Sequence, residues 1–277
     1  MANITASDVN KLRKQTGSGM MDCKNALVEA NGDFDAAIDI LRKKGQKVAA
    51  KRGDREAAEG LAIAKINADG SKGVVVMVNC ETDFVAKNEE FITFVSTIVE
   101  AALTHNPSSI EELNNSSYAG NGMTVAEKIL EQVGKIGEKI EISVYNTIEA
   151  GKVIAYNHPG NQIASLIGLS KDGDFAEAGR DVAMQVAAMA PIALNEAAVD
   201  QATIDKEIEI GKDQAIAEGK PADLAEKISK GRLNKFFKEN TLVNQAFIED
   251  NKKSVGQYLK DIDSDLAVTD FKRAALA

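Results

Sequence analysis

The sequence has few of the residues from which metal centres and disulfide frameworks are built. Its 277 residues include two histidines, two cysteines and no tryptophan. No Cys-x-x-C or His-Glu-x-x-His pattern occurs, so we expect the protein to have no metal site of its own. Cys23 and Cys80 are too few for a disulfide framework, and we expect both to be small, inert apolar residues.

Phosphate-binding loops and catalytic motifs are also absent. The chain contains no G-x-x-x-x-G-K-[ST], no G-x-G-x-x-G and no G-x-S-x-G. The Gly-Ser-Gly at residues 17–19 follows no strand-like run, so it is expected to be a turn between helices. We therefore expect no cofactor, and a protein that acts by binding. A carboxylate-based hydrolase is an open alternative, although no pair among the 42 acidic residues is favoured.

Positive charge and long apolar runs are both scarce. The 33 Lys and Arg residues face 42 Asp and Glu residues, which gives a net charge of −9. This balance argues against direct nucleic-acid binding and against binding to anionic membranes. The longest aliphatic run, residues 74–78, is far shorter than the roughly 18 residues that span a bilayer. No apolar signal segment opens the chain, so a cytoplasmic protein without membrane contact is expected.

The first 45 residues predict a three-helix domain of the ubiquitin-associated type. Thr5 and Asp8 have the spacing of a capping box, and Asp33 is placed to cap the third helix. Residues 20–30 form the expected second helix. Its predicted buried side consists of Met21, Ala26 and Leu27.

A basic stretch follows, and residues 46–58 are predicted to be a linker. Between residues 42 and 55 the chain has seven Lys and Arg residues and one acid. We favour a solvated helix end and a tether over a nucleic-acid patch, because no aromatic residues are interleaved for base stacking.

The next region predicts an α+β core of two similar subdomains. Strand-like runs at residues 61–66 and 74–78 flank a turn, and a helix follows, which defines a first subdomain at residues 59–148. The pattern returns in a second subdomain, residues 149–195 and 240–277, for which a strand at residues 242–248 is predicted. At an offset of 91 the matching pairs are Gly60 and Gly151, Ile63 and Ile154, Ala64 and Ala155, Asp83 and Asp174, Phe84 and Phe175, and Val95 and Val186.

Residues 196–239 predict an inserted antiparallel helical hairpin. The Gly-Lys-Pro at residues 219–221 has the order of a helix stop followed by a helix start. Charge-rich outer faces are compatible with a hairpin that projects from the core and with an ordinary packed helix pair. Both interpretations remain open at this point.

Residues 79–88, N-C-E-T-D-F-V-A-K-N, join a buried strand to a helix. Side chains at such a junction are able to reach a partner. Taken alone, Phe84 would be expected in the core, with Asp83 capping the helix.

Several motifs resemble those of the bacterial elongation factor Ts family. The stretch T-G-S-G-M-M-D-C-K-N-A-L at residues 16–27 and V-N-C-E-T-D-F-V-A-K-N at residues 78–88 are similar to its two signatures. Further matches follow in the same order as in the family. They are K-I-G-E at residues 135–138, short motifs between residues 219 and 237, and S-V-G-Q-Y-L at residues 254–259. The resemblance implies an N-terminal three-helix domain, a two-subdomain α+β core with antiparallel sheets, and an inserted helical hairpin.

The resemblance also implies a function and its residues. The expected function is guanine-nucleotide exchange on elongation factor Tu during translation, without bond chemistry of its own. Ts–Ts association through the helical hairpin is a further implication. Residues implied to dislodge the Mg²⁺ of Tu are Thr82, Asp83, Phe84 and Val85. Residues implied to contact Tu are Met20, Met21, Lys24, Ile136, Gly137 and His158.

A competing hypothesis is an adaptor whose three-helix domain binds a ubiquitin-like ligand or a nascent chain. This adaptor would not require Asp83 or Phe84, and it would not affect the release of GDP from Tu.

Overall fold

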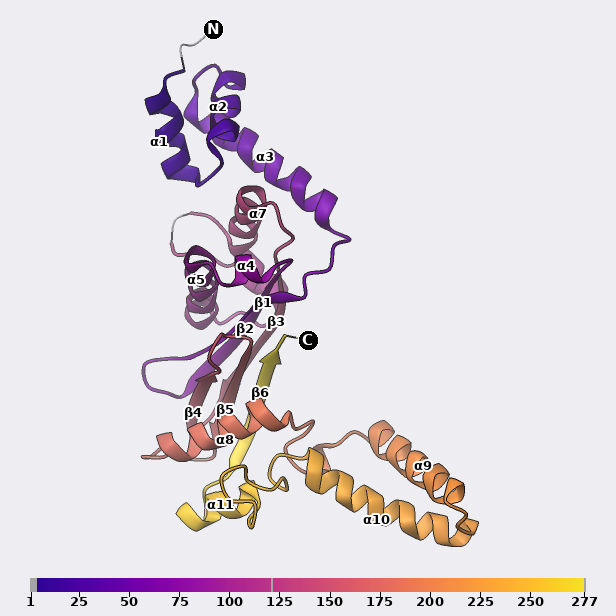
Figure 1. Cartoon of the computed structure of the whole chain (residues 1–277). Coiled ribbons are helices and arrows are strands. Elements are labelled where there is room, and N and C mark those ends of the chain that lie inside the picture. The colour runs from indigo at the N-terminus through magenta and orange to yellow at the C-terminus, as the bar shows by residue number, and fades with distance from the viewer. Residues whose placement is uncertain (1–3, 121, 277) are drawn as a thin grey trace. The chain divides into compact units, whose positions relative to one another are not determined.

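The computed structural model describes residues 4–120 and 122–276, which combine helices with two three-stranded sheets (Figure 1). One sheet has the strand order β1-β2-β3, and the other has the order β4-β5-β6. The predicted α+β class with antiparallel sheets is confirmed. Residues 1–3 of the predicted three-helix domain and residue 277 of the predicted second subdomain lie outside the described residues.

Three helices open the chain: α1 (Ala6–Thr16), α2 (Met20–Glu29) and α3 (Phe34–Arg52). The predicted capping box is present, because the Thr5 side chain accepts from the Asp8 N–H and the Asp8 carboxylate accepts from the Thr5 N–H. The side chains of Leu12, Cys23 and Leu27 are fully buried between the helices. Helix α3 continues to Arg52, so the first half of the predicted linker at residues 46–58 is helical.

The first sheet and its helices follow. Strands β1 (Glu59–Ile66) and β2 (Lys72–Cys80) precede α4 (Asp83–Ala86), α5 (Glu89–His105), α6 (Ile110–Asn115), α7 (Val125–Ile136) and β3 (Glu141–Glu149). Helices α3 and α7 pack very closely, since a Cβ on Gly134 would lie 3.0 Å from the Cα of Gly45. A glycine from each helix therefore allows the two backbones to approach.

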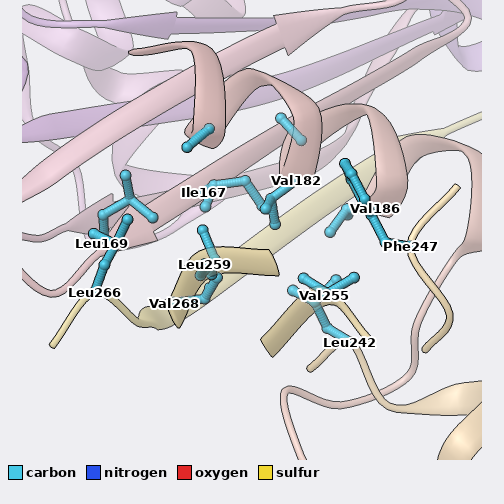
Figure 2. Packing of buried hydrophobic residues seen from close by; sticks show 12 residues of the cluster. Ile167, Leu169, Val182, Val186, Leu242, Phe247, Val255, Leu259, Leu266 and Val268 are labelled. Atoms are coloured by element: carbon cyan, nitrogen blue, oxygen red, sulfur yellow. The ribbon is translucent and has the colours of Figure 1, made fainter. Parts of the chain in front are cut away.

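The second sheet is formed by β4 (Lys152–Asn157), β5 (Ile163–Leu169) and β6 (Val268–Ala275). Strands β4 and β5 are antiparallel, with Lys152 opposite Leu169 and Asn157 opposite Ala164. Figure 2 shows side chains of β5, β6, α8 (Ala176–Met189) and α11 (Val255–Ile262) meeting in one apolar cluster. Strand β6 was not predicted from the sequence.

The strand predicted at residues 242–248 is wrong. The structure has turns there, and the backbone is held by a buried side-chain amide instead of a strand ladder. The Gln185 amide accepts from the Ile248 N–H at 2.9 Å and donates to the Ala246 carbonyl at 3.2 Å. Gln185 is fully buried and also donates to Gln245. These bonds satisfy polar backbone groups that a strand would otherwise pair.

The helical hairpin consists of α9 (Gln201–Ala217) and α10 (Ala222–Asn240), which follow the short helix η1 (Glu196–Ala198). The two helices run side by side (Figure 1), and a Cβ on Gly211 would lie 3.2 Å from the Cα of Ser229. Arg232 of α10 pairs with Glu218 at 2.7 Å. In the described part of the chain, no helix combines the length and the apolar character that crossing a bilayer requires.

The repeat at an offset of 91 has structural counterparts at two positions. Gly60 and Gly151 both face a neighbouring backbone, since a Cβ would lie 2.2 Å from the Val78 carbonyl and 2.6 Å from the Lys171 Cα, respectively. Val95 of α5 and Val186 of α8 are both fully buried. Each half therefore uses a glycine at its first strand and a buried valine on its helix.

The chain forms two compact units. Residues 1–63, 76–145 and 274–277 belong to the first, and residues 64–75 and 146–273 to the second. The three N-terminal helices thus group with the first sheet, and the division passes through β1 and β2. The domain limits expected from the sequence stay predictions.

Candidate functional site

Phe84 lies on the single helical turn α4 and is the most exposed of the large apolar side chains in the described structure, at 84%. Residues two positions apart on a helix point to nearly opposite sides. Ala86 is buried, so Phe84 is directed to solvent. The exposure that the resemblance implies for this ring is therefore observed. Its role stays a prediction.

Thr82 begins the turn as its N-cap. Its backbone is extended, and its hydroxyl oxygen accepts from the Val85 N–H at 3.4 Å. A threonine at this position satisfies one of the N–H groups that a helix start leaves without an internal partner. Val85 is half-buried beside the buried Ala86.

The carboxylate of Glu138 holds the chain just before α4. It accepts from the N–H groups of Glu81 and Thr82, both at 3.1 Å, and from the Thr82 hydroxyl at 2.7 Å. Glu81 makes the reverse connection, because its carboxylate accepts from the Lys139 N–H at 2.7 Å. The two segments are thus joined in both directions, and we call Glu81 and Glu138 the carboxylate brace.

The brace brings together the segment at residues 78–88 and K-I-G-E at residues 135–138, both of which resemble the elongation factor Ts family. Gly137 ends α7 in a left-handed conformation, φ 81°, and its N–H donates to the Val133 carbonyl at 2.8 Å. This turn directs the next residue, Glu138, to Thr82. Ile136 and Gly137 therefore lie at the same end of the unit as Thr82 and Phe84.

Arg52 connects the brace to helix α3. Its guanidinium lies 2.7 Å from the Glu81 carboxylate, whose side chain is only 14% exposed. The pair is separated by 29 residues in the chain. Sequence analysis missed it, because Arg52 was assigned to a linker and not to a helix that reaches the site.

Asp83 forms an exposed ion pair with Lys87, one helical turn later, at 2.6 Å. The Lys87 ammonium lowers the pKa of this carboxyl below its ordinary value. The aspartate beside the exposed ring is therefore ionised at neutral pH and available to a partner.

The exposed face of α2 forms a second surface of the same unit. Met20 is 54% exposed, Met21 62% and Val28 54%, and Lys24 is also exposed. The prediction that Met21 faces the core is wrong, because Cys23, Ala26 and Leu27 occupy that side. Val28 was missed, although its spacing of four and eight residues from Lys24 and Met20 places all three on one helix face.

His158 lies in the exposed turn between β4 and β5, and it belongs to the second unit. Its Nδ1 is 2.9 Å from the Tyr156 hydroxyl, and its N–H donates to the Ile163 carbonyl at 2.9 Å. The Tyr156 contact holds the ring, and the bond from the backbone N–H to Ile163 holds the main chain, both within the second unit.

Across residues 4–120 and 122–276, no three His, Cys, Asp or Glu side chains are grouped so that they could hold a metal ion. The absence of metals and cofactors from the functional protein stays a prediction.

Comparisons with known proteins agree with these motifs. Residues 81–277 match the family model described as Elongation factor TS. A protein named Elongation factor Ts from Christiangramia forsetii is 59% identical over the full length of both chains. One from Flavobacterium psychrophilum is 57% identical over the full length of both, and one from Cytophaga hutchinsonii is 48% identical, also over both complete chains. The family model and these relatives place the chain among the translation factors. The chain belongs to the elongation factor Ts family, whose members are nucleotide exchange factors of translation elongation.

Cys80 offers a direct test of this local structure. Its thiol is fully buried and donates to the Thr82 carbonyl at 3.3 Å, and burial, with a smaller effect of Glu138, raises its pKa to about 12. Because only the thiolate reacts, we expect Cys80 at pH 8 to react with a thiol reagent about 10³-fold more slowly in the folded protein than in urea. Peptide mapping after timed labelling measures this rate, and equal rates in both states would contradict the packing.

Proposed function

We propose that this protein is the guanine-nucleotide exchange factor of elongation factor Tu in the cytoplasm. It binds Tu carrying GDP, displaces the Mg²⁺ of Tu with the Thr82, Asp83, Phe84 and Val85 segment, and promotes GDP release so that GTP binds. The observation that supports this proposal best is the exposed ring of Phe84 on a braced helix start.

The physical basis is the geometry that Mg²⁺ demands. This ion requires nearly ideal octahedral coordination by oxygen atoms at 2.0–2.1 Å, so a small displacement of one ligand-bearing element disrupts its site. An aromatic ring is large and rigid and loses little conformational entropy when it inserts. The ionised Asp83 beside it repels phosphate oxygens and competes for their hydrogen-bond donors.

Exchange of this kind follows from reciprocal coupling between the binding of this protein to Tu and the binding of GDP to Tu. If the protein binds nucleotide-free Tu more tightly than Tu with GDP, then bound GDP weakens its affinity by the same factor. A factor of 10³ corresponds to about 4 kcal/mol. No covalent bond changes, so the proposed activity requires no catalytic group, metal or cofactor in this chain.

The exposed side of α2 supports a second contact with Tu. Met20, Met21 and Val28 present apolar surface beside Lys24, and flexible methionines adapt to a partner surface. We propose that this face binds the GTPase domain of Tu, and that Ile136, Gly137 and His158 provide further contacts.

Release of a fluorescent GDP analogue from purified Tu tests the function and the role of Phe84 together. We expect substoichiometric wild-type protein to accelerate release in stopped flow. Phe84→Ala should slow the maximal release rate by at least about tenfold, because each 1.4 kcal/mol of lost differential binding is one decade. Its affinity for nucleotide-free Tu should change much less.

Phe84→Leu serves as the matched variant, because it keeps an apolar side chain and lacks the rigid ring. An intermediate rate is expected for it. Equal release rates for Phe84→Ala and wild type, at equal thermal stability, would exclude the proposed role. A wild-type protein without effect on release would refute the function and favour the adaptor hypothesis.

Met21→Glu should weaken binding to Tu by about 10–100-fold, because a carboxylate would lose solvation at an apolar contact. Calorimetric titration of nucleotide-free Tu measures the dissociation constant. Ile262→Glu is the control, since this residue of α11 is similarly exposed but lies in the second unit. An unchanged dissociation constant for Met21→Glu would remove α2 from the interface.

The hairpin supports a proposal of self-association between two copies of the chain. Ile210, Ile216 and Leu224 are exposed apolar residues on α9 and α10. We expect Ile216→Glu combined with Leu224→Glu to shift any dimer seen by sedimentation velocity to the monomer. A dimer that persists in the double variant would place the association surface elsewhere.

A further inference from the structure

We propose that Glu138, Glu81 and Arg52 are positioning residues, which fix the start of α4 for presentation of Phe84 and join it to helix α3. The proposal rests on the exchange function proposed above. It assigns roles to three side chains that would not themselves enter the magnesium site of the partner.

The first argument is that α4 is too short to hold itself. A helix of four residues is a single turn. The first turn of a helix is unfavourable to form, and here no further turns follow to compensate, so it is unstable in water on its own. The Phe84 ring is almost wholly in solvent, so it contributes little packing that could fix the turn. The restraint on its direction must come from the residues before it.

The second argument is the number of donors that Glu138 satisfies. One carboxylate accepts from two consecutive N–H groups and one hydroxyl, all within 3.1 Å. Hydrogen bonds to an ionised acceptor are stronger than those between neutral groups. The Thr82 hydroxyl that donates to Glu138 is also the acceptor for the Val85 N–H, so the brace orients the N-cap itself.

The third argument concerns Arg52. Its ion pair with Glu81 fixes a carboxylate that already accepts from the Lys139 N–H, so one Glu81 oxygen contacts each partner. Helix α3 also packs on α7 through Gly45 and Gly134, and α7 leads directly into Glu138. Helix α3 therefore meets the braced segment by two routes, one ionic and one through close backbone packing.

A consequence is that the α2 surface and Phe84 belong to one connected body. Helix α2 packs on α3, and α3 reaches the brace through Arg52. A partner that binds α2 then meets Phe84 in a fixed position, and the ordering of the turn need not be repeated during binding.

The experiment compares Glu138→Gln, Arg52→Gln and Arg52→Lys. Glu138→Gln preserves the shape but replaces one acceptor oxygen by an N–H₂ donor and removes the charge, so the remaining oxygen cannot serve both the N–H groups of residues 81 and 82 and the Thr82 hydroxyl. Two variants are the matched controls. Glu127→Gln makes the same substitution elsewhere in α7, and Arg232→Gln removes an ion pair with Glu218 that is also 2.7 Å long. Circular dichroism verifies that each variant is folded.

Two readouts are used, and one of them does not involve Tu. The first is the labelling rate of Cys80, whose thiol donates to the Thr82 carbonyl, with the buried Cys23 as an internal reference in the same peptide map. The second is GDP release from Tu at increasing concentrations of this protein, which gives the maximal release rate and, separately, the protein concentration at half of that rate. A structural defect elsewhere in the protein would change Cys23 labelling as well.

For Glu138→Gln we expect Cys80 labelling at least about tenfold faster, an unchanged Cys23 rate and a maximal release rate about tenfold lower, with half-saturation changed less than about threefold. Arg52→Gln should show the same pattern at about three- to fivefold, and Arg52→Lys should restore most of the wild-type behaviour, because the ion pair is retained. The control variants should match wild type.

Because burial and, in part, the Glu138 charge itself raise the pKa of the Cys80 thiol, the deciding variant is Arg52→Gln, which keeps that charge. Unchanged Cys80 labelling in Arg52→Gln would overturn the brace. Faster labelling with a wild-type release rate would overturn its role in positioning Phe84. If wild-type protein releases no GDP, the proposed function fails, whereas the Cys80 rates still decide whether the brace holds the segment.

Discussion

The carboxylate of Glu138 on the backbone of Glu81 and Thr82 is the interaction on which the candidate site depends. A strand ends at Cys80, and a helical turn begins at Asp83, so the N–H groups between them have no ladder or helix partner. Glu138 supplies that partner from a segment 56 residues away in the chain. Because the acceptor is a carboxylate, it holds two backbone groups and the capping hydroxyl at once. Exposure of an aromatic ring is compatible with a fixed direction only under such a restraint.

The internal repeat offers a second phenylalanine with which Phe84 can be compared. Phe175 occupies the position that matches Phe84 at the offset of 91, but it packs against the apolar cluster of the second sheet. Phe84 is 84% exposed, and complete burial of a phenylalanine side chain contributes about 1.5–3 kcal/mol. That burial remains available to a partner surface. The two halves therefore share glycine and valine positions that serve the fold, and they differ at the phenylalanine that is proposed to serve function.

Local patterns predicted most of the fold, and long-range contacts account for what they missed. Alternation and helical spacing located the first two strands and the long helices, because each element buries one face. Residues 242–248 have an apolar pattern, yet buried Gln185 takes their backbone groups, and nothing local shows this. Helix α3 continues beyond Gly45, where the backbone of Gly134 lies close to it, and no local pattern shows this contact. At the site, the motifs named Thr82 to Val85, whereas Glu138 and Arg52 became evident only from their distances.

Rigidity in the interface of an exchange factor has a specific physical value. A ring that inserts beside a tightly coordinated ion experiences a restoring force from that ion and its ligands. If the ring were carried on a mobile loop, the loop would yield first, and the partner's site would keep its geometry. A carboxylate brace, an ion pair and a glycine-mediated helix contact all oppose that yielding. On the proposed function, differential affinity for the nucleotide-free partner would depend on how little the presenting segment relaxes, so the supporting carboxylates would contribute to coupling together with the ring.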